Sequence, residues 1–299
     1  MSQQEQSSNS VGQLESEARS TALHTRILRK FFNNYVAVLC SVALIAFIVA
    51  ILVAPLITPY DPIERSTPER NQPPSVAHLM GTDTLGRDIL SRVLYGGRIS
   101  LQVGFFSVAL ALAVGMPLGL LAGFSGGWVD NAIMRMMDVI LAFPGLILAI
   151  WLVSLLGSNI INVILAIAFF SIPTYARLVR GLTLSIREMD YVIAARSMGA
   201  GSLRLMFNHI LPGVVGSMIV VTTLDVSGAI ITGASLSFLG LGVSPPTPEW
   251  GAMLADGRSY LRTQWWMAVF PGLAITFVVL MLNIIGDAVR DALDPNVRE

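Results

Sequence analysis

Charged side chains are scarce in this sequence. Only 13% of its 299 residues are charged and 54% are hydrophobic, whereas about 25% of the residues in soluble domains are charged. The mean hydropathy is +0.69. This composition excludes an ordinary soluble domain and indicates a membrane protein. The 19 basic and 19 acidic residues balance, and no long basic block points to nucleic acid, so we expect no nucleic-acid partner.

Cysteine and histidine are also rare. The single cysteine, Cys40, lies in an apolar run and can form no disulfide within the chain, so we interpret it as a packing residue. The three histidines, at positions 24, 78 and 209, all lie outside the long apolar runs. The sequence motifs of zinc proteases and serine hydrolases are absent. We therefore expect no enzyme, and no metal or cofactor bound by this chain.

Lysine occurs once, as Lys30 in the stretch KFFNN. An ATP-binding P-loop needs a lysine after Gly-x-x-x-x-Gly, because this lysine reaches the β- and γ-phosphates. No such motif is present in the sequence. If ATP drives this protein, ATP and Mg²⁺ must be bound by partner chains.

Long apolar runs, in contrast, are plentiful. About 20 apolar residues cross the hydrocarbon core of a bilayer as a helix. We predict an all-α polytopic membrane protein with six transmembrane helices, at residues 36–57, 100–124, 136–157, 159–180, 214–241 and 266–286.

Both ends of the chain are predicted to be cytoplasmic. Residues 1–35 begin with a segment rich in Ser, Gln and Glu, which indicates a disordered tail. Arg26, Arg29 and Lys30 precede the first span, and six crossings return the C-terminal tail, 291–299, to the same side. Twelve basic residues then lie inside and seven outside, a weak bias toward this orientation.

The first extracytoplasmic loop, 58–99, has two parts. Its first half is rich in proline and is expected to be extended. In its second half, Leu85, Ile89 and Val93 lie at four-residue spacing, which predicts an amphipathic helix on the membrane surface or across the bundle. The second outer loop ends at Trp265 and Trp266, where an interfacial anchor is expected.

Two acidic residues lie in apolar surroundings. Asp138 follows Arg135 by three residues, a spacing that predicts a local ion pair on one helix face. Asp225 lies within the fifth predicted span, where burying a carboxylate costs roughly 2.5–3.5 kcal/mol. It is either a packing partner or part of a transport pathway. Gly233 belongs to a set of small residues in the same span that permit close helix approach.

A polar segment, DYVIAARSMGAGSLRLMFNHILP, lies between two apolar runs. Asp190 is placed to cap a short helix that carries Arg196 near its C-terminus. Gly199 starts a turn, Ser202 is placed to cap a second helix, and Pro212 opens the next span. Residues 185–213 are therefore predicted to form a helix-turn-helix outside the lipid, either gripped by a partner or simply solvated.

At these residues the sequence resembles the EAA loop of permease subunits in bacterial ABC importers. The matching positions are Ala194, Ala195, Gly199, Leu211 and Pro212. Two positions depart from the motif: Ile193 stands in place of the usual Glu, and His209 in place of Ile. The resemblance implies that this loop is the coupling helix, which sits in a cleft of the ATPase. Asp190 and Arg196 would belong to the same coupling surface.

Three further stretches are similar to the C-type permease of the dipeptide, oligopeptide and nickel group, at 78–100, 236–254 and 283–295. Gly233 stands where many relatives have an acid. The resemblance implies a type I ABC importer permease fold, with the permease domain at 100–290. It also implies a location in the lipid of the bacterial inner membrane, a B-type sister permease, two P-loop ATPases and an extracytoplasmic solute-binding protein.

The activity implied by this resemblance is import by alternating access. Short peptides are the expected cargo, although close relatives carry nickel chelates, glutathione or sugars. Two other classes of function compete with this prediction. An ion-driven secondary transporter needs an ion site in the middle of the membrane, for which Asp225 is the one candidate. A membrane scaffold or receptor would bind partners without moving cargo.

Overall fold

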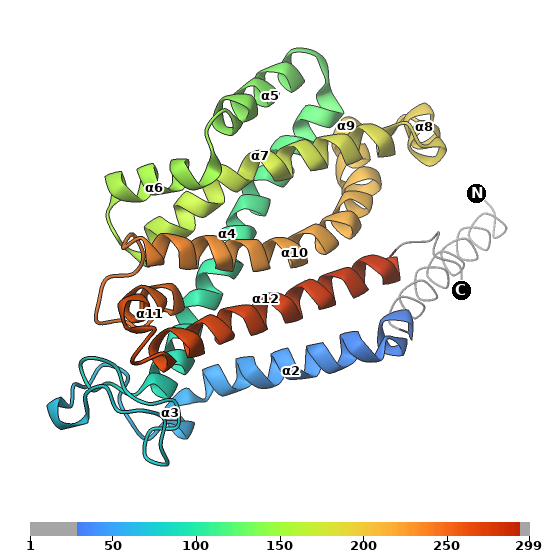
Figure 1. Cartoon of the computed structure of the whole chain (residues 1–299). Helices are drawn as coiled ribbons and strands as arrows, with labels where there is room; N and C mark the ends of the chain where they lie inside the picture. The colour runs from blue at the N-terminus through green and yellow to red at the C-terminus, as the bar shows by residue number, and fades with distance from the viewer. Residues whose placement is uncertain (1–28, 294–299) are drawn as a thin grey trace.

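The computed structural model describes residues 29–293, so residues 1–28 of the predicted N-terminal tail and residues 294–299 of the C-terminal tail lie outside the described residues. The described part is helical and holds no β-strand (Figure 1). Its elements are α2 (Tyr35–Leu52), α3 (Ala54–Ile57), η1 (Thr67–Glu69), α4 (Ile89–Ser125), α5 (Gly127–Leu141), α6 (Gly145–Leu156), α7 (Ile160–Arg187), α8 (Asp190–Ser197), α9 (Ser202–Arg204), η2 (Leu205–Ile210), α10 (Leu211–Phe238), α11 (Trp250–Gly257), η3 (Arg258–Tyr260) and α12 (Trp266–Leu293).

Five of the described helices are long and apolar enough to cross a membrane. They are α2, α4, α7, α12 and the helix that runs from Ser202 through α10. The sixth predicted span, 136–157, is not one helix, because α5 and α6 meet at an angle of 84°. Pro144 precedes α6, and a proline disfavours the helical conformation of the residue before it. The prediction of a continuous third span is therefore wrong, and the described helices give a sixth crossing only if the bent pair counts as one span.

The predicted amphipathic helix of the first outer loop does not form a separate element. The helix α4 begins at Ile89 and continues without a break to Ser125. Asp88 caps it by accepting a hydrogen bond from the Ser91 backbone N–H at 2.7 Å. Leu85 therefore lies in the loop, and Val93 belongs to the first turns of a span. The proline-rich half of the loop is irregular, as predicted, except for the short helix η1.

The helices α4 and α7 make the most extensive helix–helix contact in the described bundle. Gly115, Gly119 and Gly123 follow one another at four-residue spacing along α4. A Cβ atom at Gly119 would collide with the carbonyl oxygen of Ala176 in α7, and one at Gly123 would lie 2.7 Å from the Cβ of Thr183. Small residues at this spacing let two helix backbones approach each other within a membrane. This glycine ladder explains how α4 and α7 become the central pair.

The outer ends of the helices are joined by buried polar contacts. Trp250, at the start of α11, is fully buried, and its indole N–H donates to the carbonyl oxygen of Val93 at 2.8 Å. The buried carboxylate of Glu249 accepts from Ser100 Oγ at 3.0 Å and caps α11. Trp266 is also buried, so only Trp265 of the predicted aromatic anchor is exposed enough to meet the interface.

Both described ends of the chain lie at one end of the bundle. The Lys30 ammonium donates to the backbone carbonyl of Asp291 at 2.6 Å. Figure 1 shows α8 at this same end, whereas α3 and α11 lie at the opposite end. The polar segment and both described ends of the chain therefore lie at the same end of the helix bundle.

Candidate functional site

The polar segment forms a compact protrusion that starts with α8, here called the hairpin (residues 190–210). Asp190 is the first residue of α8 and does not cap it, because Met189 holds the N-cap position and no side chain caps this end. The prediction of Asp190 as a capping residue is therefore wrong. Its carboxylate is still favoured there, since the N-terminal turn of a helix carries partial positive charge.

The turn of the hairpin depends on Gly199. Its φ angle is +84°, a backbone conformation that glycine adopts without the steric cost of a Cβ. The Gly199 N–H donates to the carbonyl of Arg196 at 3.0 Å, and the Ala200 N–H donates to that of Ala195 at 3.1 Å. These paired bonds satisfy two carbonyls at the end of α8 in a Schellman motif. The predicted turn at Gly199 is confirmed.

The second helix of the predicted helix-turn-helix is not separate from the next span. A single turn, α9, continues through the π-helical segment η2 into α10. Gly201 holds the N-cap position and the Ser202 side chain makes no capping bond. Pro212 lies in the first turn of α10, as predicted, although the helix also continues back from there through η2 and α9.

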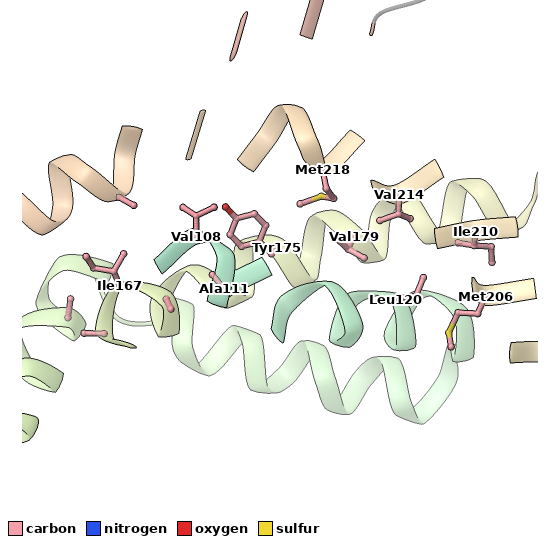
Figure 2. Close-up of a cluster of buried hydrophobic side chains, with 14 of the residues drawn as sticks. Val108, Ala111, Leu120, Ile167, Tyr175, Val179, Met206, Ile210, Val214 and Met218 are labelled. Atoms are coloured by element: carbon pink, nitrogen blue, oxygen red, sulfur yellow. The ribbon is translucent and has the colours of Figure 1, made fainter. Parts of the chain in front are cut away.

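The two alanines of the motif face opposite ways. Ala195 and Val192 are buried in a cluster that also includes Met206 and Ile210. Figure 2 shows Met206 and Ile210 in this cluster. Ala194, in contrast, is exposed on the outer face of α8. The remaining motif residues lie at the base of the hairpin, where Leu211 is half-buried and Pro212 is exposed.

The outer face of the hairpin is unusually apolar for a segment outside the lipid. Ile193 is 44% exposed, Met198 82% and Leu203 70%. Arg196 is exposed beside them. Contiguous apolar side chains in contact with water typically mark a surface that binds a partner. Ile193, at the position where the motif has Glu, is thus one of three apolar side chains exposed on the hairpin.

Asp138 lies in ion pairs that join α5 to α7. Arg135 Nη1 is 3.7 Å from its carboxylate, as the three-residue spacing predicted, but Arg177 Nη2 of α7 is much closer, at 2.6 Å. A second pair, Asp130 with Arg180, joins the same two helices at 2.6 Å. The spacing along α5 gave no signal for either partner on α7. Asp138 therefore links α5 to α7 through a partly exposed ion pair.

Asp225 lines a cavity of about 230 Å³ between α4, α7 and α10. The Tyr175 hydroxyl is buried at the same cavity, and Figure 2 shows its ring between Val108 of α4 and Met218 of α10. Gly233 does not line the cavity. A Cβ at Gly233 would lie 2.6 Å from Val103 Cγ1, so this glycine serves the close contact of α10 with α4.

Comparison with known families gives two matches. The family described as "Binding-protein-dependent transport system inner membrane component" matches residues 115–299. The family described as "N-terminal TM domain of oligopeptide transport permease C" matches residues 24–74. Together they cover most of the described chain and leave residues 75–114 between them.

Named relatives extend over most of the chain. The glutathione transport system permease protein GsiD of Pectobacterium atrosepticum is 49% identical over 271 residues, which cover 90% of each chain. The dipeptide transport system permease protein DppC of Alkalihalophilus pseudofirmus is 44% identical over 89% of this chain and 88% of its own. The di/tripeptide transport system permease protein DppC of Pseudomonas aeruginosa is 49% identical over 83% and 84%.

Solved structures agree on the fold. An inward-facing form of the MetNI methionine ABC transporter superposes with a TM-score of 0.56 at 19% identity, over 68% of this chain and 97% of its own. A second inward-facing form gives a TM-score of 0.55 at 17% identity, over 67% and 96%. The fold is that of a type I ABC importer permease.

Proposed function

The chain belongs to the binding-protein-dependent inner-membrane permeases of ABC importers, and we propose that it moves short peptides into the cell by alternating access. This family consists of multi-pass permease subunits, which are not enzymes; ATPase activity resides in partner subunits, and a binding protein supplies the cargo. The proposal adds a B-type sister permease, two P-loop ATPases that bind ATP and Mg²⁺, and an extracytoplasmic solute-binding protein.

The identity of the relatives supports peptide cargo. The names of three relatives at 44–49% identity refer to glutathione, dipeptides and di/tripeptides. All three are short peptides. A cargo of this class is accordingly proposed for the present chain, with selection among peptides left mainly to the binding protein.

The single observation that carries the coupling role is the apolar outer face of the hairpin. Ile193, Met198 and Leu203 are exposed on a protrusion outside the predicted spans, and exposure of such side chains to water is unfavourable. We infer that they enter a cleft of a partner ATPase. Because Ile193 replaces the usual Glu, this contact rests on apolar burial at that position and not on an ion pair.

The hairpin is rigid and is connected directly to α10, so that its movement is passed on to this helix. Its two segments are held together by the Schellman turn at Gly199 and by burial of Val192 and Ala195. The second segment then runs without a break into α10, which reaches Asp225. In the proposed mechanism, ATP-driven closure of the ATPases moves the hairpins, because the closed ATPase dimer binds them better in one transporter state than in the other.

The proposed orientation places both chain termini and the hairpin in the cytoplasm. The contact between Lys30 and Asp291 supports a shared side for the two ends, and α8 lies at that same end (Figure 1). The outer loop, α11 and the start of α12 would then face the binding protein.

The first test is to extract the tagged chain gently from membranes and to identify its partners by mass spectrometry. A second permease and one or two P-loop ATPases are expected. The purified assembly is then reconstituted in liposomes with the binding protein, and peptide uptake is measured with ATP inside or with an imposed ion gradient.

These conditions separate the three classes of function. ATP-dependent uptake supports the importer. Uptake by the isolated chain that follows the ion gradient would identify a secondary transporter instead. Partner binding with no uptake under either condition would favour a scaffold or receptor.

A further inference from the structure

The cavity beside Asp225 lies half-way across the bundle. Asp225 is near the middle of α10, and Tyr175 is near the middle of α7. No basic side chain is among the residues that line the cavity. The carboxylate of Asp225 therefore has no cation beside it there, although an unpaired charge is costly at this depth. A positively charged ligand would remove that cost.

Two further hydroxyl groups in the cavity are oriented as acceptors. Ser171 Oγ donates its proton to the carbonyl of Ile167, and Thr232 Oγ1 donates to that of Gly228, both at 2.9 Å. A hydroxyl oxygen that has donated its single proton still has lone pairs to accept with. Both residues line the cavity, so their hydroxyl oxygens are candidate acceptors for a group that enters it.

Tyr175 adds a polar group that lacks a partner. The residue is 1% exposed, and its hydroxyl lies near the Asp225 carboxylate but makes no hydrogen bond of ordinary geometry within the described chain. Buried polar groups are nearly always hydrogen-bonded, so an exception calls for an explanation. A bound ligand that reaches both Tyr175 and Asp225 would supply the missing bond.

The cavity opens on a side that the rest of this chain leaves uncovered. Thr174 and Gly228, two of its lining residues, are exposed. Its volume of about 230 Å³ is several times the ~30 Å³ share of one water molecule. It has room for one end of a small peptide, with the remainder of the molecule outside the chain.

From this chemistry we propose that the cavity binds the α-ammonium group of the cargo peptide during its passage through the membrane. The inference rests on the proposed function of peptide import. An ammonium group carries three donors and no acceptor, which matches one carboxylate surrounded by acceptor oxygens. Asp225 is the counter-ion and Tyr175 accepts a second hydrogen bond. All peptides with a free N-terminus carry this group, whatever their side chains. The site would therefore bind the cargo independently of its amino-acid sequence.

The first experiment compares uptake by three variants of the complete transporter in liposomes, with peptide-loaded binding protein outside and ATP inside. Asp225→Asn removes the charge and Tyr175→Phe removes the hydroxyl. Thr223→Val is the matched control, because Thr223 lies on the same helix but lines the separate groove between α2, α4, α10 and α12.

Uptake of a dipeptide is expected to fall about tenfold or more in Asp225→Asn, since hydrogen bonds to charged groups are stronger than those between neutral groups. Tyr175→Phe is expected to show a smaller loss, and Thr223→Val none. ATP hydrolysis stimulated by the loaded binding protein should remain within about twofold of the original rate in all three, which shows that the variants are folded and assembled. Unchanged uptake in both Asp225→Asn and Tyr175→Phe would overturn the proposal.

A second experiment detects the contact directly. A dipeptide whose N-terminal residue carries a photoreactive diazirine side chain is illuminated in the working transporter, and the labelled residues are mapped by mass spectrometry. Labelling of the cavity segments of α7 and α10 is expected in the original chain and in Thr223→Val, with loss in Asp225→Asn. Labels only outside these segments, or equal labelling in Asp225→Asn, would contradict the proposal.

Different results would contradict the proposed peptide import and the proposed ammonium site. If the original transporter imports no dipeptide with ATP, the proposed function is wrong. If it imports dipeptides and the cavity variants import them equally well, only the ammonium site is wrong.

Discussion

Two regions of this molecule depend on glycine for opposite reasons. At the glycine ladder of α4, the neighbours leave no room for a side chain: a Cβ at Gly119 would collide with the backbone of α7. At the turn of the hairpin, a Cβ at Gly199 would meet no atom within 4 Å, but the φ angle is +84°. The ladder is thus constrained by packing and the turn by backbone geometry. Substitutions should damage the fold in the first region and the coupling in the second.

The largest effect is expected from filling the ladder. Gly119→Leu should destabilise the chain by about 3 kcal/mol or more, because the helix backbones must separate to admit the side chain. Thermal unfolding of the purified protein in detergent measures the change. Gly181→Leu on α7 is the control, since a Cβ there meets no atom within 4 Å. A similar unfolding temperature for both variants would contradict the close contact of α4 with α7.

A second prediction concerns the turn of the hairpin. Gly199→Pro locks φ near −65° and removes the N–H that bonds to Arg196. ATP-dependent uptake should fall about tenfold or more, a loss of roughly 1.4 kcal/mol or more in coupling, while the protein still reaches the membrane. Gly201→Pro is the matched control because Gly201 already has φ −67°. Equal uptake by the two proline variants would remove the role assigned to the turn.

A third prediction compares the buried Ala195 with the exposed Ala194 in the hairpin. Ala195→Glu buries a carboxylate against the hairpin core and should destabilise the hairpin by about 2 kcal/mol, which limited proteolysis detects as new cleavage near residue 199. Ala194→Glu places the same charge on the exposed face. It should lower ATP-dependent uptake without new cleavage. Cleavage in both variants, or in neither, would show that the burial difference has no consequence.

The smallest effect is expected for the ion pairs of α5. Asp130→Asn removes the pair with Arg180, whose side chain is 34% exposed, and should lower stability by about 1 kcal/mol or less. The loss should diminish at high salt, as measured by thermal unfolding in detergent. Arg135→Gln is the milder control, because that side chain is 85% exposed. A loss as large as that of the ladder variant would mean that α5 belongs to the rigid centre.

The sequence predicted most of the spans because apolar length is read directly along the chain. The ends of α7, α10 and α12 lie within several residues of the predicted ones. The bend between α5 and α6 was not predicted. Residues 142–144 lie inside an apolar run, and hydropathy carries no information on the backbone restriction that Pro144 imposes. The start of α4 was also mispredicted. A surface helix and the first turns of a transmembrane helix both show apolar residues at helical spacing, so the pattern does not distinguish them.

The site was only partly predictable because its contacts join distant parts of the chain. The location of the hairpin followed from its polarity and from Gly199. The difference between Ala194 and Ala195 requires the cluster packed beneath α8. Asp138 and Arg177 are 39 residues apart in the sequence, so their ion pair cannot be predicted from the spacing along one helix. Tyr175 carried no sequence signal, since its importance comes from Asp225 on another helix.

One unbroken helix, from Ser202 to Phe238, connects the hairpin to the Asp225 cavity. Movement of the hairpin should therefore displace Asp225. The π-helical segment η2 ends at Ile210, and the path along the curved helix from there to Asp225 is ~22 Å long at 1.5 Å per residue (Figure 1). If the helix pivots at η2, a tilt of about 10° displaces Asp225 by at most ~4 Å, which is longer than a hydrogen bond. In the proposed mechanism, a small rotation at the hairpin end would therefore be enough to break the contact between Asp225 and a bound ammonium group and to release the cargo.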